Sequence, residues 1–247
     1  MRSNINVYWS CRDKLVNNEL LYFPPSNLTK ELNFYYSEKS KSKQNELNFY
    51  LRCPAFKEKY KNTFVVKAFK DYYLEYTSQK DNSFRITSSD KNEKEFENSF
   101  MPRDISLKLG TLQWLNYYYS DTSLEMETFP AYHFNTEFNQ KTHFLDGQFN
   151  INKWFRPIDL TFFLKPQYNS LSIKRGDPLF YIRFKTKNNI KLSYFKYNSK
   201  LHEFSTQLVN YKEFNPHQPF KKLYDLFLEK KYNVRILKEI KNNLTGY

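Results

Sequence analysis

The chain has 247 residues, which is enough for one large β domain or two small ones with a buried core. Its two cysteines are too few for a disulfide scaffold or a four-cysteine zinc site, and its four glycines exclude a dinucleotide-binding fingerprint. The net charge of +13 is typical of a protein with an anionic partner, but lysines scattered by AT-rich coding produce the same value. Because the sequence lacks a signal peptide and any run of about 18 apolar residues, we expect neither secretion through such a peptide nor a membrane segment.

The first half of the chain predicts strands separated by polar loops. Alternating or β-branched apolar residues indicate strands at residues 5–9, 47–51, 63–69, 105–109 and 111–119. Residues 72–77 and 84–87 flank a polar turn and predict a hairpin. The polar, charged stretches at 37–46 and 88–98 are typical of exposed loops.

The clearest strand pattern lies between residues 144 and 185. Apolar side chains recur at every second position from Ile158 to Leu164, which places them on one face of a strand. Alternation returns at 171–174 and, after a turn that contains Gly176 and Pro178, again at 179–184. This spacing predicts a three-stranded antiparallel meander with one face in a core, and residues 190–197 predict another strand.

The end of the chain changes to helical spacing. Asn215 and Pro216 are suited to a helix start, and apolar residues follow at the intervals of one helix face: Phe220, Leu223, Tyr224, Phe227 and Leu228. We therefore expect a mainly β protein, an antiparallel β-sandwich or a jelly-roll-like barrel, with one or two C-terminal α-helices. The expected division is an antiparallel β domain at 1–213 and a helical segment at 214–247 packed on it.

One group of residues suggests a metal site. His133, Glu137 and His143 supply the ligand types of a two-histidine, one-carboxylate centre, such as the iron site of a cupin-like barrel. There they would hold Fe(II) or another divalent metal. Scattered histidines in an aromatic-rich chain are also common as ordinary surface or core residues. Outside this alternative we expect no cofactor, and no catalytic residue is identified.

Basic residues alternate with aromatic ones in three stretches. They lie at residues 56–61, 194–200 and 220–222. Aromatic rings can stack on bases while lysines hold phosphates, which makes nucleic acid an alternative partner for a chain of net charge +13. The whole chain has a similar composition, so these stretches alone do not distinguish a binding surface from a general bias.

Trp154 and Arg156 precede the best strand. Pro157 extends the backbone before it, so the two side chains are expected on one face with the guanidinium over the indole. We predict a structural role for Arg156, with carboxylates such as Asp159 taking its other donors. The alternative is an exposed arginine that binds a phosphate or a carboxylate.

Four segments carry a resemblance to a known group of proteins: VYWSC, RCPAFKEKYKNTFVVKAFKDYYL, GQFNINKWFRPIDLTFFLK and RGDPLFYIRFKT. In these segments the chain resembles a family of uncharacterised proteins from tailed phages of marine bacteria. The resemblance implies a viral origin and an AT-rich genome. It implies no activity and carries no catalytic residues with it.

These observations lead to three hypotheses of function. The first is a non-enzymatic phage protein, a virion-structural or assembly or host-interaction β domain, located in the host cytoplasm or in the virion and with a phage or host protein as partner. The second is a metal-dependent enzyme on a cupin-like barrel with His133, Glu137 and His143 as ligands. The third is a basic nucleic-acid-binding module.

Overall fold

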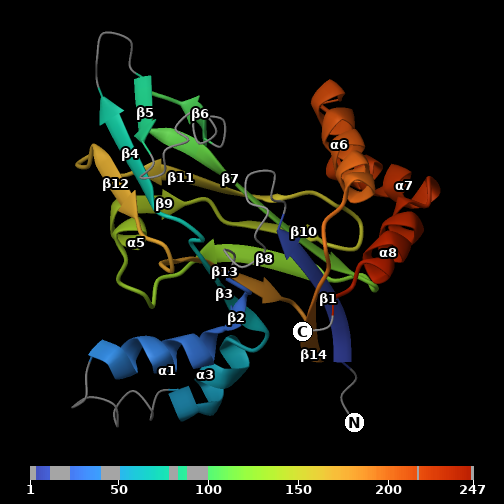
Figure 1. Cartoon of the computed structure of the whole chain (residues 1–247), viewed down its shortest axis with the longest axis horizontal. Helices are drawn as coiled ribbons and strands as arrows, with labels where there is room; N and C mark the ends of the chain where they lie inside the picture. Colours follow the sequence, from blue (N-terminus) through green and yellow to red (C-terminus); the bar gives the residue numbers. More distant parts are fainter. Residues whose placement is uncertain are drawn as a thin grey trace.

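A computed structural model describes residues 4–11, 23–39, 51–77, 83–87, 100–215 and 217–245, without the side chains of 77, 83–87, 114–115 and 220 (Figure 1). Strands make up 39% of these residues and helices 31%, so the protein is mainly β, as the sequence predicts. No sheet closes into a barrel within this part of the chain. None of its helices is long and apolar enough to cross a membrane.

The largest sheet, sheet A, is centred on the long strand β7. Its order is β14 (Asn189–Tyr194), β1 (Asn4–Cys11), β7 (Leu109–Ser120), β11 (Ile158–Leu164) and β9 (Thr142–Phe144), with β6 (Phe100–Asp104) also paired to β7. All of these neighbours are antiparallel except β1 and β14, which run parallel. The antiparallel prediction is therefore correct for most of the sheet.

Two smaller sheets complete the β structure. Sheet B has the order β10 (Gly147–Asn150), β8 (Glu125–Pro130), β13 (Pro178–Phe184), β3 (Thr63–Lys67) and β2 (Ser26–Asn27). Sheet C has the order β12 (Ser170–Ile173), β4 (Tyr72–Thr77) and β5 (Ser83–Thr87). The predicted hairpin is confirmed, because β4 and β5 pair antiparallel.

The predicted meander is wrong. The three strands lie where the alternation places them, but β11 belongs to sheet A, β12 to sheet C and β13 to sheet B. Period two identifies the buried face of each strand without naming its partner. The turns at 165–169 and 174–177 pass the chain from one sheet to the next instead of folding it back.

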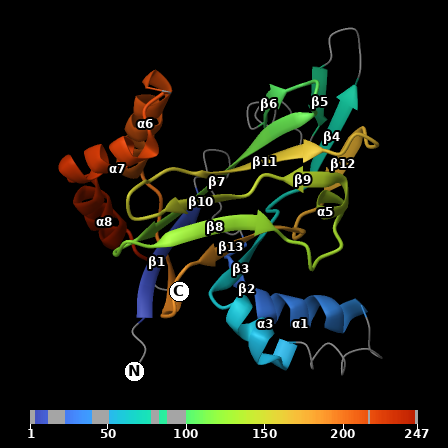
Figure 2. The same ribbon diagram turned by 180° about the vertical axis from the view of Figure 1, so that it is seen from behind.

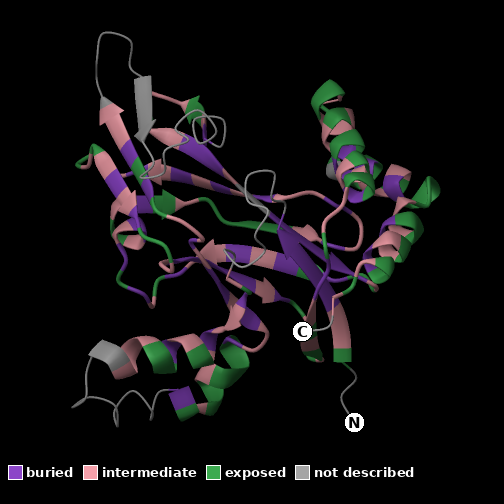
Figure 3. Cartoon of the chain, viewed as in Figure 1, coloured by how far each residue is buried: buried purple, intermediate pink, exposed green. Residues whose placement is uncertain are grey.

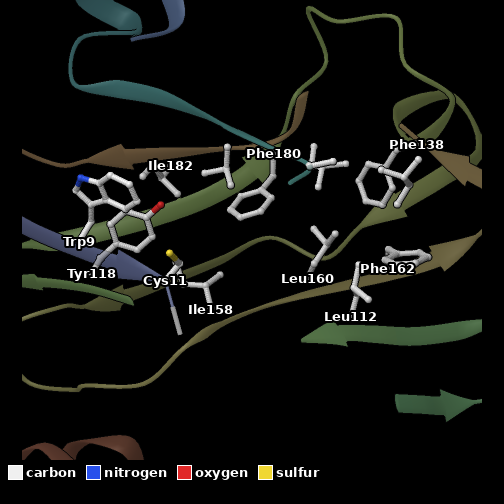
Figure 4. Close-up of a cluster of buried hydrophobic side chains, with 14 of the residues drawn as sticks. Trp9, Cys11, Leu112, Tyr118, Phe138, Ile158, Leu160, Phe162, Phe180 and Ile182 are labelled. Atoms are coloured by element: carbon white, nitrogen blue, oxygen red, sulfur yellow. The ribbon is translucent and has the colours of Figure 1, made fainter. Parts of the chain in front are cut away.

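The main core fills the space between the sheets. Phe180 and Ile182 of β13 point toward the side chains of β11, among them Ile158 and Leu160, and Trp9 and Tyr118 close one end (Figure 4). All of these side chains are buried. The arrangement is sandwich-like, and the alternating residues predicted for 158–164 and 179–184 supply much of its interior.

Three helices cover part of the outer face of sheet A, over β1 and β7: α6 (Ser199–Phe214), α7 (Phe220–Glu229) and α8 (Tyr232–Asn242). Tyr117 and Tyr119 point toward them, whereas Tyr118 between them points into the main core. Leu223 and Phe227 of α7 are buried in this layer. Tyr224 is half-buried there, the side chain of Phe220 lies outside the described part, and Leu228 is exposed.

The helical part is longer than predicted. It begins at Ser199 rather than at residue 214, and it contains three helices rather than one or two. Asn198 caps α6, since its side chain accepts a 2.9 Å hydrogen bond from the backbone N–H of Leu201. The apolar face of α6 is narrow, with Leu201 and Leu208 as its buried hydrophobic residues, which explains why its sequence gave little helical signal.

Two helices cover part of the outer face of sheet B: α1 (Leu28–Lys39) and α3 (Pro54–Lys59). Leu32 and Tyr60 pack there against Val65 and Tyr181 of the sheet. The side chains in these contacts are buried, and Figure 3 shows how burial is distributed over the chain. The two helical groups lie on opposite sides of the β layers in both ribbon views (Figure 2). The outer face of sheet B is less covered toward β10, where Gln148 is exposed.

Candidate functional site

The three residues predicted as metal ligands have separate surroundings. His133 lies in the turn after β8, with Nδ1 3.0 Å from the hydroxyl of Tyr181. Glu137 begins α5 (Glu137–Lys141) and accepts hydrogen bonds from Lys141 Nζ at 2.6 Å and the backbone N–H of Ser172 at 2.8 Å, while His143 is exposed on β9. Within the described ranges, no three His, Cys, Asp or Glu side chains gather in a group that could hold a metal ion. The structure therefore does not assemble the predicted ligand set.

Glu137 instead lines a polar cleft of about 450 Å³ between α1 and the turn that leads into β13. Lys67 and Glu31 pair there at 2.6 Å, and Glu137 pairs with Lys141. Burial raises the pKa of the Glu137 carboxyl, but the hydrogen bonds from Lys141 and Ser172 outweigh it and hold the pKa below its ordinary value. Because these charges already neutralise one another, the cleft shows no strong preference for an external ion.

His133 belongs to an aromatic cluster on the outer side of sheet B. Its ring centroid lies 4.6 Å from that of Tyr132, 5.0 Å from that of Tyr60 and 5.9 Å from that of Tyr181. The Tyr181 hydroxyl also accepts the backbone N–H of His133 at 3.3 Å. Burial, helped by the positive charge of Lys59, lowers the pKa of His133. The imidazole is therefore neutral at neutral pH and fixed in place.

Tyr132 is the exposed member of this cluster. Tyr132 keeps 53% of its surface accessible to solvent, and its hydroxyl lies 2.6 Å from the hydroxyl of Tyr60. Burial and the hydrogen bond to Tyr60 raise the pKa of the Tyr132 hydroxyl, so it stays protonated at physiological pH. The ring is thus held by His133 packing against it and by the bond at its tip, with much of its surface open to solvent.

Basic side chains gather where α3 and the turn after it meet the end of β13 and the segment that follows β13, and two of them, Lys59 and Arg183, line a cavity together with Tyr132. Arg183 donates to the backbone carbonyl of Lys59 at 3.1 Å, and Lys61 Nζ donates to the carbonyl of Lys187, so the two segments lie in contact. We call this the basic surface; its cations are Lys57, Lys59, Lys61, Arg183, Lys185 and Lys187. Glu127 takes part of this charge, since it forms ion pairs with Arg183 and Lys185.

A cavity of about 480 Å³ lies within the basic surface. Strands β8 and β10 form one part of its wall, and Lys59, Tyr132 and Arg183 form another. The Arg183 guanidinium lies over the ring of Phe129, which also lines the cavity, 5.1 Å from the ring centroid. The cavity therefore combines two aromatic rings with the cations Lys59 and Arg183, and the carboxylates of Glu127 and Asp146 also line it and balance part of that charge.

The other two basic and aromatic stretches do not form a comparable surface. Tyr194 and Phe195 are buried in the cores on either side of sheet A, so their rings are not available for stacking. Lys200 pairs with Glu239 at 3.0 Å. The side chain of Phe220 is outside the described part of the chain, although Lys221 and Lys222 beside it are exposed. Of the three stretches, only 56–61 lies beside an exposed tyrosine, Tyr132, within the described residues.

The prediction for Trp154 and Arg156 is correct in one respect. Trp154 is buried under the C-terminal helices, and Arg156 forms an ion pair of 3.5 Å with Asp159, as expected for a structural arginine. No cation–π contact joins the two residues, both of which are described. Arg156 remains one-third exposed, so it is held by Asp159 and the backbone of Pro157 rather than by the indole.

Half of the basic surface gave a signal in the sequence. Lys57, Lys59 and Lys61 stand in a stretch that alternates with aromatic residues, but Tyr132 and Arg183 come from other strands and turns. Each of them looks ordinary in a chain with 21 tyrosines and 39 basic residues. A comparison of the chain with known proteins found no matching family model, no curated relative and no similar solved structure.

Proposed function

We propose that this protein is a non-enzymatic binding protein that engages nucleic acid through the basic surface. The observation that supports the proposal is the gathering of six cations where the α3 segment meets the end of β13, two of which, Lys59 and Arg183, line a cavity with the exposed Tyr132. Four acidic side chains lie among them: Glu58, Glu125, Glu127 and Asp146. The local charge is therefore positive, as a phosphate backbone requires.

The cations of the basic surface are not equally available to bind phosphate. Arg183 and Lys185 are partly neutralised by Glu127, whereas Lys57 and Lys59 have no carboxylate partner within the described residues. Lys59 lies over the ring of Tyr60, 5.4 Å from its centroid, which keeps the ammonium close to the aromatic cluster. We therefore assign the main phosphate contacts to Lys57 and Lys59.

The salt dependence of binding tests this assignment. Each phosphate contact releases counterions, so the logarithm of the association constant should fall with the logarithm of salt concentration by about 0.7 to 0.9 per contact. Removing two contacts with Lys57→Ala and Lys59→Ala should weaken binding and reduce this slope by about 1.4 to 1.8. Fluorescence anisotropy with a labelled oligonucleotide over a series of salt concentrations measures both quantities.

The matched control removes the same charge elsewhere. Lys221→Ala with Lys222→Ala changes two exposed lysines of α7, which lies on sheet A rather than sheet B. This variant should keep the wild-type slope. Equal losses in the two double variants would mean that net charge alone drives binding, and the absence of binding at low salt would refute a nucleic-acid role. The viral origin implied by the resemblance, and the phage or host protein partner of the first hypothesis, remain predictions of the sequence.

A further inference from the structure

We propose that the cavity beside Tyr132 receives one unstacked base of a single-stranded nucleic acid, which stacks on the Tyr132 ring while Lys59 faces the adjoining phosphate. This inference rests on the proposed function and names the form of its ligand. It follows from three features of the basic surface: a fixed and exposed ring, a cavity of suitable size and a cation at its rim.

The first feature is the rigidity of Tyr132. Stacking on a base costs less when the ring is already ordered, because no side-chain freedom is lost on binding. The bond to the Tyr60 hydroxyl and the packing of His133 against the ring supply that order. With 53% of the residue accessible, Tyr132 still offers enough apolar surface for a base.

The second feature is the volume of the cavity. About 480 Å³ lies within the range of roughly 300–1,000 Å³ typical of small-ligand sites, and a single nucleotide is a ligand of that class. The bases of a duplex are stacked inside the helix and cannot enter such a cavity. A base can reach it only when the strand is unpaired and the base is turned outward.

The third feature is the cation at the rim, Lys59, which lines the cavity and lies over the Tyr60 ring. The other polar groups of the cavity decide which base is taken. Gln148 lines the cavity, but its amide already donates to Glu125 at 2.8 Å and accepts from Lys185. Arg183 is engaged by Glu127 and by the carbonyl of Lys59. With these groups occupied, stacking rather than hydrogen bonding to the base edge should dominate. We therefore expect weak sequence preference, as in other surfaces that bind single strands by stacking.

The test uses the full chain and a labelled oligothymidylate of about 12 nucleotides, within the length that such surfaces cover. The wild-type protein should bind it more tightly than a duplex of the same length. Tyr132→Ala should weaken binding roughly 5- to 150-fold, the range expected for the loss of one stacked base. Tyr132→Phe keeps the ring and should stay within about threefold of the wild type, because the ring rather than the hydroxyl contacts the base.

A second arm changes the oligonucleotide instead of the protein. An oligonucleotide with abasic sites keeps its phosphates, so wild-type protein should bind it more weakly, and Tyr132→Ala should then cause no further loss. This arm does not depend on how well the variant folds, because the first comparison uses wild-type protein alone.

Two results would overturn the inference. The first is duplex binding as tight as single-strand binding; the second is equal affinity for intact and abasic strands. If Lys57→Ala with Lys59→Ala still weakened binding in that case, the proposed nucleic-acid function would stand without the base site. If no nucleic acid bound at low salt, the function itself would be refuted.

Discussion

Replacing Phe227 tests whether α7 is held on the β layers as described. Phe227 is 1% exposed and lies among Tyr117, Tyr119 and the other residues that join the helices to sheet A. Phe227→Ala should remove this packing and leave a cavity, at a cost of about 3–5 kcal/mol in the free energy of unfolding. For a chain of this size, that loss lowers the melting temperature by roughly 6–20 °C.

The adjacent residue provides the control. Leu228 is 37% exposed, so Leu228→Ala removes a similar apolar group from a helix position that is only partly packed. It should cost about 1 kcal/mol or less. Urea unfolding followed by tryptophan fluorescence measures both losses, and Trp154 lies in the same cluster as Phe227 and so reports on that layer. Equal losses in the two variants would contradict the burial of Phe227.

Two further predictions concern single residues of the β layers. Gly110→Ala should destabilise the protein by about 1–3 kcal/mol, because the added Cβ would overlap the buried Phe100 ring. Gly147→Ala is the control, since the nearest atom to its added Cβ would be Thr128 Oγ1 at 3.8 Å. Equal melting temperatures of the two variants would contradict the close packing at Gly110. Glu137→Gln should flatten the loss of stability as pH falls below the ordinary pKa of a glutamate. The lowered folded-state pKa of Glu137 contributes stability above that ordinary value, and this contribution is lost as pH falls through the lowered pKa. Thermal melts across this range measure the effect, and an unchanged acid limb would contradict the bonds from Lys141 and Ser172.

Local patterns predicted most of the strands, but residues 105–108, expected in a strand, form the turn between β6 and β7, and the strand expected at 47–51 lies outside the described residues except for Leu51, which is helical. The alternation from Ile158 to Leu164 fixes which residues of β11 face the core, whatever strand lies beside it. The helical spacing of the apolar residues in α7 likewise predicted the burial of Leu223 and Phe227. It did not predict α6, where the polar residues outnumber the buried ones and helix formation depends on packing against the sheet.

The candidate site was hardly visible in the sequence. The spacing of His133, Glu137 and His143 suggested a metal centre, but the turn after β8 brings His133 to Tyr181 while α5 carries Glu137 to Lys141 and Ser172. A spacing along the chain constrains the distance between residues without deciding the direction of their side chains. That direction depends on where β8, α5 and β9 pack, which involves strands far away in sequence.

The sequence by itself determined the β-rich class, the buried faces of the strands and the amphipathic C-terminal helix, because each depends on a period of two or 3.6 residues within one segment. Only the tertiary structure decided which strands share a sheet and which basic residues meet. Arg183 reaches Lys59 across 124 positions of the chain, and Tyr132 reaches Tyr60 across 72. Such contacts leave no local pattern, since they follow from the pairing of sheet B and from the packing of α3 on its outer face.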